Sequence, residues 1–157
     1  EKSILINFKI AQEEFKKYLK DYDLSDGNIK LKIKHTYEVV DKSEYLARKL
    51  GLDEENIELA KLIALLHDIG RFEQVKRYNT FLDRISVNHG KYGVKVLFED
   101  DLIRNFIEDN KCDEIIRKAI LNHNKDKIQE DCSEKELYSA SELKSSIIYL
   151  EKIQKTK

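Results

Sequence analysis

The chain has 157 residues, of which 29 are basic and 30 are acidic, and its formal net charge is −1. This length predicts one domain, and the interleaved charges provide no concentrated basic face, so we expect neither nucleic acid nor an anionic membrane as a partner. No apolar run reaches the roughly 18–20 residues that span a bilayer, and the start EKSILINFKI lacks a signal-peptide pattern. Cys112 and Cys132 lie in polar surroundings without Cys-x-x-Cys spacing, so we expect a cytoplasmic protein without a structural disulfide.

The absence of proline, together with only 5 glycines, predicts an almost entirely helical chain. Apolar residues at intervals of three and four predict helices over 4–20 and about 29–50. A third helix follows Asp53, a favoured N-cap residue. Its segment LIALL is apolar on every side, so we expect this helix at the centre of the fold, with Gly70 as its stop signal.

The second half of the chain contains shorter helical patterns. Residues 71–86 predict an irregular or partly helical excursion, and residues 87–100 a short helix that carries His89. Two further helices are expected at about 101–110 and 113–122. A last helix is expected to begin with the capping box of Ser133 and Glu136 and to run towards residue 153.

Histidine is rare in this chain, and each histidine falls on or beside the buried face of a different predicted helix. The four are His35, His67, His89 and His123. One histidine in such a position is more often a hydrogen-bonded interior residue than a ligand. Four in equivalent positions, with none in the surface segments crowded with Lys and Glu, differ from this usual case.

His67 and Asp68 stand side by side at the end of the apolar helix. Neighbouring side chains on a helix diverge by about 100°, but one metal ion beyond the helix end can be reached by both. A cation there would also offset the cost of burying the carboxylate. The alternative is that Asp68 only orients His67 or caps a neighbouring helix.

The order of His35, the pair His67 and Asp68 within HDIG, and then His89 and His123 resembles the HD superfamily of metal-dependent phosphohydrolases. The resemblance covers about residues 30–124. It implies an all-α, single-domain HD-type helical bundle that occupies residues 1–157.

The resemblance also implies roles for these side chains. His35, His67 and Asp68 would bind a first metal ion, and His89 and His123 would bind a second ion or contact the phosphate. Imidazoles with a carboxylate suit a divalent Fe, Mn, Co, Ni or Zn ion, and one or two ions are expected. Such ions activate a water for attack on phosphorus.

In the resembling enzymes the aspartate of the motif also orients this water, so we expect a catalytic role for Asp68. Arg71, directly after the motif, is expected to pair with the phosphate, and Lys91 is a second candidate. For both cations the alternative is a solvated surface charge.

The family pattern also has a distal aspartate on its last core helix, but no aspartate follows Asp131 here. Asp126 and Asp131 come too early, and Glu142 would have to take this role. Either the site lacks the ligand, or a stretch that carries it is absent near residues 136–144. Because the chain contains no methionine, we expect the sequence to be a subset of the natural polypeptide, which favours the second explanation.

The expected function is hydrolysis of a small phosphate ester, such as a nucleotide. Aromatic side chains near the motif could stack on a nucleobase, although such residues more often form core. They are Tyr78, Phe81 and Tyr92. Two alternatives stay open: a di-iron oxygenase of the HD type, and a degenerate, non-catalytic module that binds a nucleotide.

Overall fold

The structure is a computed structural model that describes residues 6–123. These residues form helices and connecting segments without any β-strand, which confirms the predicted all-α fold class. The helices are α1 (Phe8–Leu19), α2 (Gly27–Lys49), α3 (Glu54–Leu66), α4 (Ile69–Tyr78), α5 (His89–Val94), α6 (Ile103–Phe106) and α7 (Asp113–Asn122), with a 3₁₀ turn η1 (Asp83–Ile85) and a π-helical stretch η2 (Lys95–Glu99).

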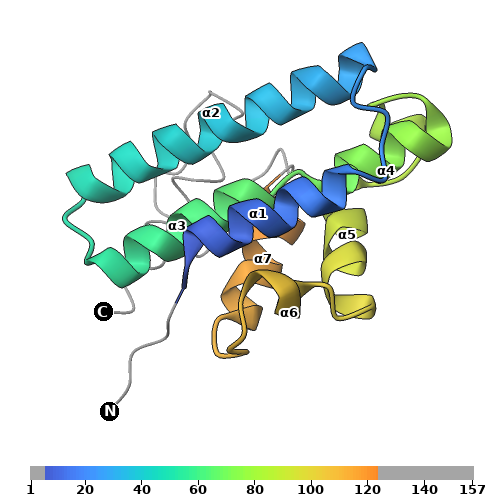
Figure 1. Cartoon of the computed structure of the whole chain (residues 1–157). Helices are drawn as coiled ribbons and strands as arrows, with labels where there is room; N and C mark the ends of the chain where they lie inside the picture. Colours follow the sequence, from blue (N-terminus) through green and yellow to red (C-terminus); the bar gives the residue numbers. More distant parts are fainter. Residues whose placement is uncertain (1–5, 124–157) are drawn as a thin grey trace.

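Helix α3 lies at the centre of the fold, as its all-round apolar sequence predicts. Leu62, Ile63, Leu65 and Leu66 are fully buried. Helix α2 runs antiparallel beside α3, and α1 and α7 also pack against α3 (Figure 1). Burial on all sides of one helix holds both of its ends in fixed positions, and the end after Leu66 carries the HD pair.

Local signals in the sequence account for the boundaries of this helical pair. The side chain of Asp26 caps α2 by accepting from the backbone N–H of Asn28 at 2.7 Å. The side chain of Asp53 caps α3 by accepting from the backbone N–H of Asn56 at 2.9 Å. Gly51 follows α2 with φ +74°, a conformation that glycine adopts without strain.

Gly70 does not end α3, contrary to expectation. Helix α3 ends at Leu66 and α4 begins at Ile69, so Gly70 lies in the first turn of α4. A Cβ atom on Gly70 would lie 2.6 Å from the backbone nitrogen of Gly93 and 2.6 Å from the carbonyl oxygen of His89. The glycine therefore allows α4 and α5 to approach closely, and its role is in packing rather than in helix termination.

The segment 71–86 is more regular than expected, because α4 continues to Tyr78. The residue after it, Asn79, is the C-cap and adopts a left-handed conformation with φ 53°. One inward position of α4 is taken by Gln74, whose side chain is fully buried. A polar residue at an inward position weakens the apolar periodicity that indicates a helix, and this explains the underprediction.

The helix expected over 101–110 is also shorter, since α6 spans only Ile103–Phe106. The helix expected to begin at Ser133 lies outside the described residues. Among residues 6–123, no helix has both the length and the apolar character that crossing a membrane requires.

Candidate metal centre

His67 and Asp68 occupy the two-residue break between α3 and α4. Aspartate is a favoured N-cap residue, yet the Asp68 side chain makes no capping hydrogen bond to α4. Its carboxylate is instead buried, with 4% of the residue exposed. Capping of the following helix is therefore not its role.

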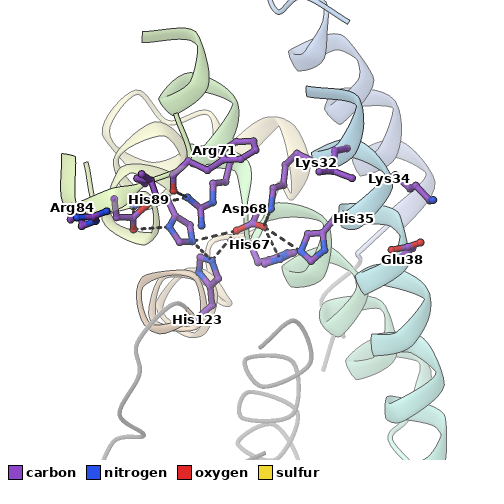
Figure 2. A pocket seen from close by; sticks show the side chains of 14 residues that line it. Lys32, Lys34, His35, Glu38, His67, Asp68, Arg71, Arg84, His89 and His123 are labelled. Carbon is purple, nitrogen blue, oxygen red and sulfur yellow. Dashed lines mark hydrogen bonds and ion pairs between the residues drawn. The ribbon is translucent and has the colours of Figure 1, made fainter. Parts of the chain in front are cut away.

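Four imidazoles surround the Asp68 carboxylate (Figure 2). Oδ2 lies 3.3 Å from His67 Nε2 and 3.4 Å from His35 Nε2. Oδ1 lies 2.9 Å from His123 Nε2 and 3.5 Å from His89 Nε2. The structure thus brings all five predicted metal ligands together. They form two groups that share Asp68, and within each group the possible ligand atoms lie within 4.8 Å of one another.

Hydrogen bonds on the far side of the rings determine which nitrogen faces Asp68. His67 Nδ1 lies 2.6 Å from the carbonyl oxygen of Ala64, and His123 Nδ1 lies 2.7 Å from that of Ile120. A carbonyl oxygen only accepts, so Nδ1 carries the proton in both rings. In a neutral imidazole this leaves the Nε2 lone pair directed at the carboxylate.

His89 is oriented in the same way by a carboxylate. Its Nδ1 lies 2.8 Å from Asp83 Oδ2, which also accepts from the His89 backbone N–H at 3.1 Å. Burial and the nearby His123 charge lower the pKa of His89 to about 4, so this ring is neutral near pH 7. Its Nε2 lies 2.9 Å from His123 Nε2.

In neutral imidazoles the Nε2 lone pairs would face the negatively charged Asp68 oxygens at close range. This arrangement is stable only if a positive charge lies between them. One way to satisfy them is a second proton on an imidazole. Burial would raise the pKa of Asp68, but the charge of His67 and hydrogen bonds from His123, His35 and His67 hold it well below its usual range. The other way is a metal ion, and a set of imidazole nitrogens with an ionised carboxylate fits a transition metal.

Two residues that the sequence analysis did not single out contact this cluster. Lys32 Nζ lies 3.1 Å from Asp68 Oδ2. Asp83, which orients His89, comes from the turn η1. Lys32 stands three residues before His35, on the same face of α2, and this spacing was a signal that could have been used. Nothing in the local sequence around Asp83 indicates its contact.

Arg71 lines the same pocket, but one of its terminal nitrogens is already engaged. Nη1 donates to the carbonyl oxygen of Phe81 at 2.6 Å, to Gln74 Oε1 at 2.9 Å and to Asp83 Oδ1 at 3.1 Å. These bonds tie α4 to the segment before α5. Arg71 Nε is buried and has no hydrogen-bond partner among residues 6–123. Pairing of Arg71 with a phosphate stays a prediction.

The cluster forms part of a cavity of about 780 Å³. Besides the predicted ligands, Arg71, Lys32 and Asp83, its lining consists of Leu31, Lys34, Glu38, Phe81, Leu82 and Arg84. Lys91 is exposed and does not line it, nor do Tyr78 and Tyr92. Of the predicted aromatic contacts, only Phe81 lies at the cavity.

Comparison with known proteins gives a match to a protein family. A family model described as HD domain matches residues 33–153. No curated protein and no solved structure matches the chain. The matched segment contains His35, the HD pair, His89 and His123, and it continues beyond residue 123. The distal aspartate that the resemblance implies would follow His123 and so lie outside the described residues.

Proposed function

Because the chain belongs to the HD domain family, we propose that it is a metal-dependent phosphohydrolase that acts on a small phosphate ester, such as a nucleotide. The observation that supports this proposal most strongly is the orientation of His67, His89 and His123. Each ring donates its Nδ1 proton to a protein oxygen and turns Nε2 towards Asp68. Histidines that bind metals are usually oriented by such an outer hydrogen bond.

The two groups around Asp68 suit one or two ions. His35, His67 and Asp68 would hold the first, and His89, His123 and Asp68 the second. The preponderance of imidazole favours Fe, Mn, Co, Ni or Zn over Mg, which prefers oxygen ligands. When bound, such an ion lowers the pKa of a water towards ~7 and polarises a phosphoryl oxygen.

The rest of the cavity supports an anionic substrate with an apolar part. Four basic side chains line it against two carboxylates outside the histidine cluster, Glu38 and Asp83, and its volume of about 780 Å³ is in the range of small-molecule sites. Leu31, Phe81 and Leu82 provide an apolar side, on which a base or another apolar group would pack. The basic side chains are Lys32, Lys34, Arg71 and Arg84.

Within this cavity, Asp68 is expected to have two tasks. It would hold metal through both oxygens and orient the attacking water, because no other carboxylate in the described part of the chain lies between the histidine groups. Arg71 and Asp83 would keep the segment before α5 in place and thereby position His89.

Elemental analysis of the protein purified without chelators tests the proposal. We expect one or two transition-metal ions per chain in the wild type and none in His67→Ala, with helix content unchanged by circular dichroism. Tyr45→Ala, which removes an exposed ring on α2, is the matched control and should retain the metal. The metal-loaded wild type should release phosphate from at least one member of a nucleotide panel.

Other results would favour the alternatives. Dioxygen consumption by the iron-loaded protein without phosphate release would replace the hydrolase with a di-iron oxygenase. Absence of metal from the wild type, even after addition of Mn²⁺ or Fe²⁺, would leave a non-catalytic module.

A further inference from the structure

Lys32 points from α2 into the metal centre rather than into solvent (Figure 2). Its Nζ lies 3.1 Å from Asp68 Oδ2, and 16% of its side chain is exposed. The ammonium also lies 5.3 Å from the centre of the Phe81 ring. It therefore faces both the carboxylate of the metal centre and the apolar side of the cavity.

This placement is unusual for lysine, whose ammonium is strongly hydrated and whose long side chain loses many conformations when it is held in place. Lys30 on the same helix shows the usual behaviour, since it is exposed and does not line the cavity. Lys34 lines the cavity but is exposed, so Lys32 differs from both in having its ammonium held against a buried carboxylate.

The acceptor of Lys32 is also a candidate metal ligand. Asp68 Oδ2 belongs to the group formed with His35 and His67, and it is the hydrogen-bond acceptor of Lys32 within the described residues. A divalent cation on this carboxylate would repel the ammonium and compete for the same oxygen. Lys32 then needs another anionic partner, and the cavity that it lines is where such a partner would bind.

We propose that Lys32 binds a phosphoryl oxygen of the substrate, and that its contact with Asp68 is exchanged for this contact when the metal centre is loaded. The inference rests on the proposed phosphohydrolase function. A phosphate monoester carries about −1.5 to −2 charges at pH 7 and three acceptor oxygens, so it can contact a metal ion and an ammonium at the same time. Lysine is a common point-charge ligand of phosphate.

Lys32→Gln tests the proposal in the manganese-loaded protein, with inorganic phosphate as the probe. Calorimetry should show phosphate binding weakened by about tenfold or more, as expected for the loss of a hydrogen bond to a charged group. Manganese per chain should equal that of the wild type. With a hydrolysed ester, KM should rise more than kcat falls, and Lys32→Arg should restore part of the binding. Lys30→Gln, with the same charge change at an exposed position of α2, should bind phosphate as the wild type does.

Equal phosphate binding by wild type and Lys32→Gln would overturn the inference and leave Lys32 as a counter-ion of Asp68. Loss of manganese from Lys32→Gln would also overturn it, because the lysine would then support the centre itself. Failure of the underlying function looks different: the manganese-loaded wild type would neither bind phosphate nor hydrolyse any ester, and the inference would fall with it. If the wild type hydrolyses esters and Lys32→Gln binds phosphate normally, only the role of Lys32 is wrong.

Discussion

The pair of His35 and His67 and the pair of His89 and His123 are held beside Asp68 by different kinds of structure. His35 lies on α2 and His67 directly follows α3, and these two antiparallel helices of 23 and 13 residues pack against each other. His89 begins α5, which has 6 residues, and His123 follows α7, which has 10. The first pair is positioned by regular helix packing. The second depends on a few close contacts between short elements.

Two of these contacts are visible in the structure. Gly70 lets α4 approach α5, and Asp83 accepts two hydrogen bonds from His89. Because each contact rests on one residue, we expect a single substitution to separate the two halves of the centre. The α2–α3 half should tolerate comparable changes better.

The largest such effect is expected from Gly70→Ala. The new Cβ would meet backbone atoms at 2.6 Å, which cannot move aside as a flexible side chain does. We expect a loss of about 1–3 kcal/mol in the free energy of unfolding, measured by chemical denaturation, together with the loss of metal from the His89 side. Gly27→Ala is the matched control, since a Cβ there would meet nothing within 4 Å. Equal stability of the two variants would contradict the close approach of α4 and α5.

A smaller and more local effect is expected from Asp83→Asn. The amide can still accept from Arg71, but it no longer provides a charged acceptor for His89 Nδ1. Loss of a hydrogen bond that orients a metal-binding histidine typically lowers metal affinity by about 10–100-fold. Titration with Mn²⁺ should show weakening at the second site only, while Asp41→Asn, at an exposed position of α2, should leave both sites unchanged. Equal weakening at both sites would mean that the halves are not independent.

The smallest effect is expected at Cys112, the residue before α7. Its thiol is buried, so its reaction rate with an alkylating reagent should measure how often α7 moves away from the core. The residue is 8% exposed, and burial, with Glu55, Asp109 and Asp113 nearby, raises the pKa of its thiol. In a Cys132→Ser background, iodoacetamide should therefore react slowly near pH 8 and faster as the pH rises above 9. Added Mn²⁺ should slow the reaction a few-fold, because metal binding at His123 opposes opening of α7. A rate unaffected by Mn²⁺ would show that α7 is not held by the metal.

The difference between the halves also separates what the sequence could predict from what it could not. The all-round apolar segment before His67 indicated a central helix, which is a local and periodic signal. The resemblance of the histidine order to the HD superfamily indicated one shared cluster. Lys32 shares a helix face with His35, but charged residues on a helix face are usually solvated, and Asp83 in its turn carries no local signal. Only the tertiary arrangement shows that they turn inward.

Gln74 illustrates the same limit inside a helix. Its buried amide donates to Asp83, to Ser86 and to the carbonyl oxygen of Val87. Hydrogen bonds, rather than apolar contacts, therefore hold the segment before α5 against α4. Pattern analysis assumes that inward positions are apolar. The extent of the domain over residues 1–157 and the distal ligand after His123 stay predictions, because they fall partly or wholly outside residues 6–123.

Because Asp68 belongs to both histidine groups, metal binding would also affect the conformational freedom of the chain. His89 and His123 are separated by 34 residues, and His123 and Asp68 by 55. A bound ion would therefore act as a reversible cross-link that closes several loops at once, through one carboxylate as the common node. Because the two groups share Asp68, ions bound in both would restrain the chain over residues 35–123. The melting temperature of this protein would then vary with the free metal concentration around it.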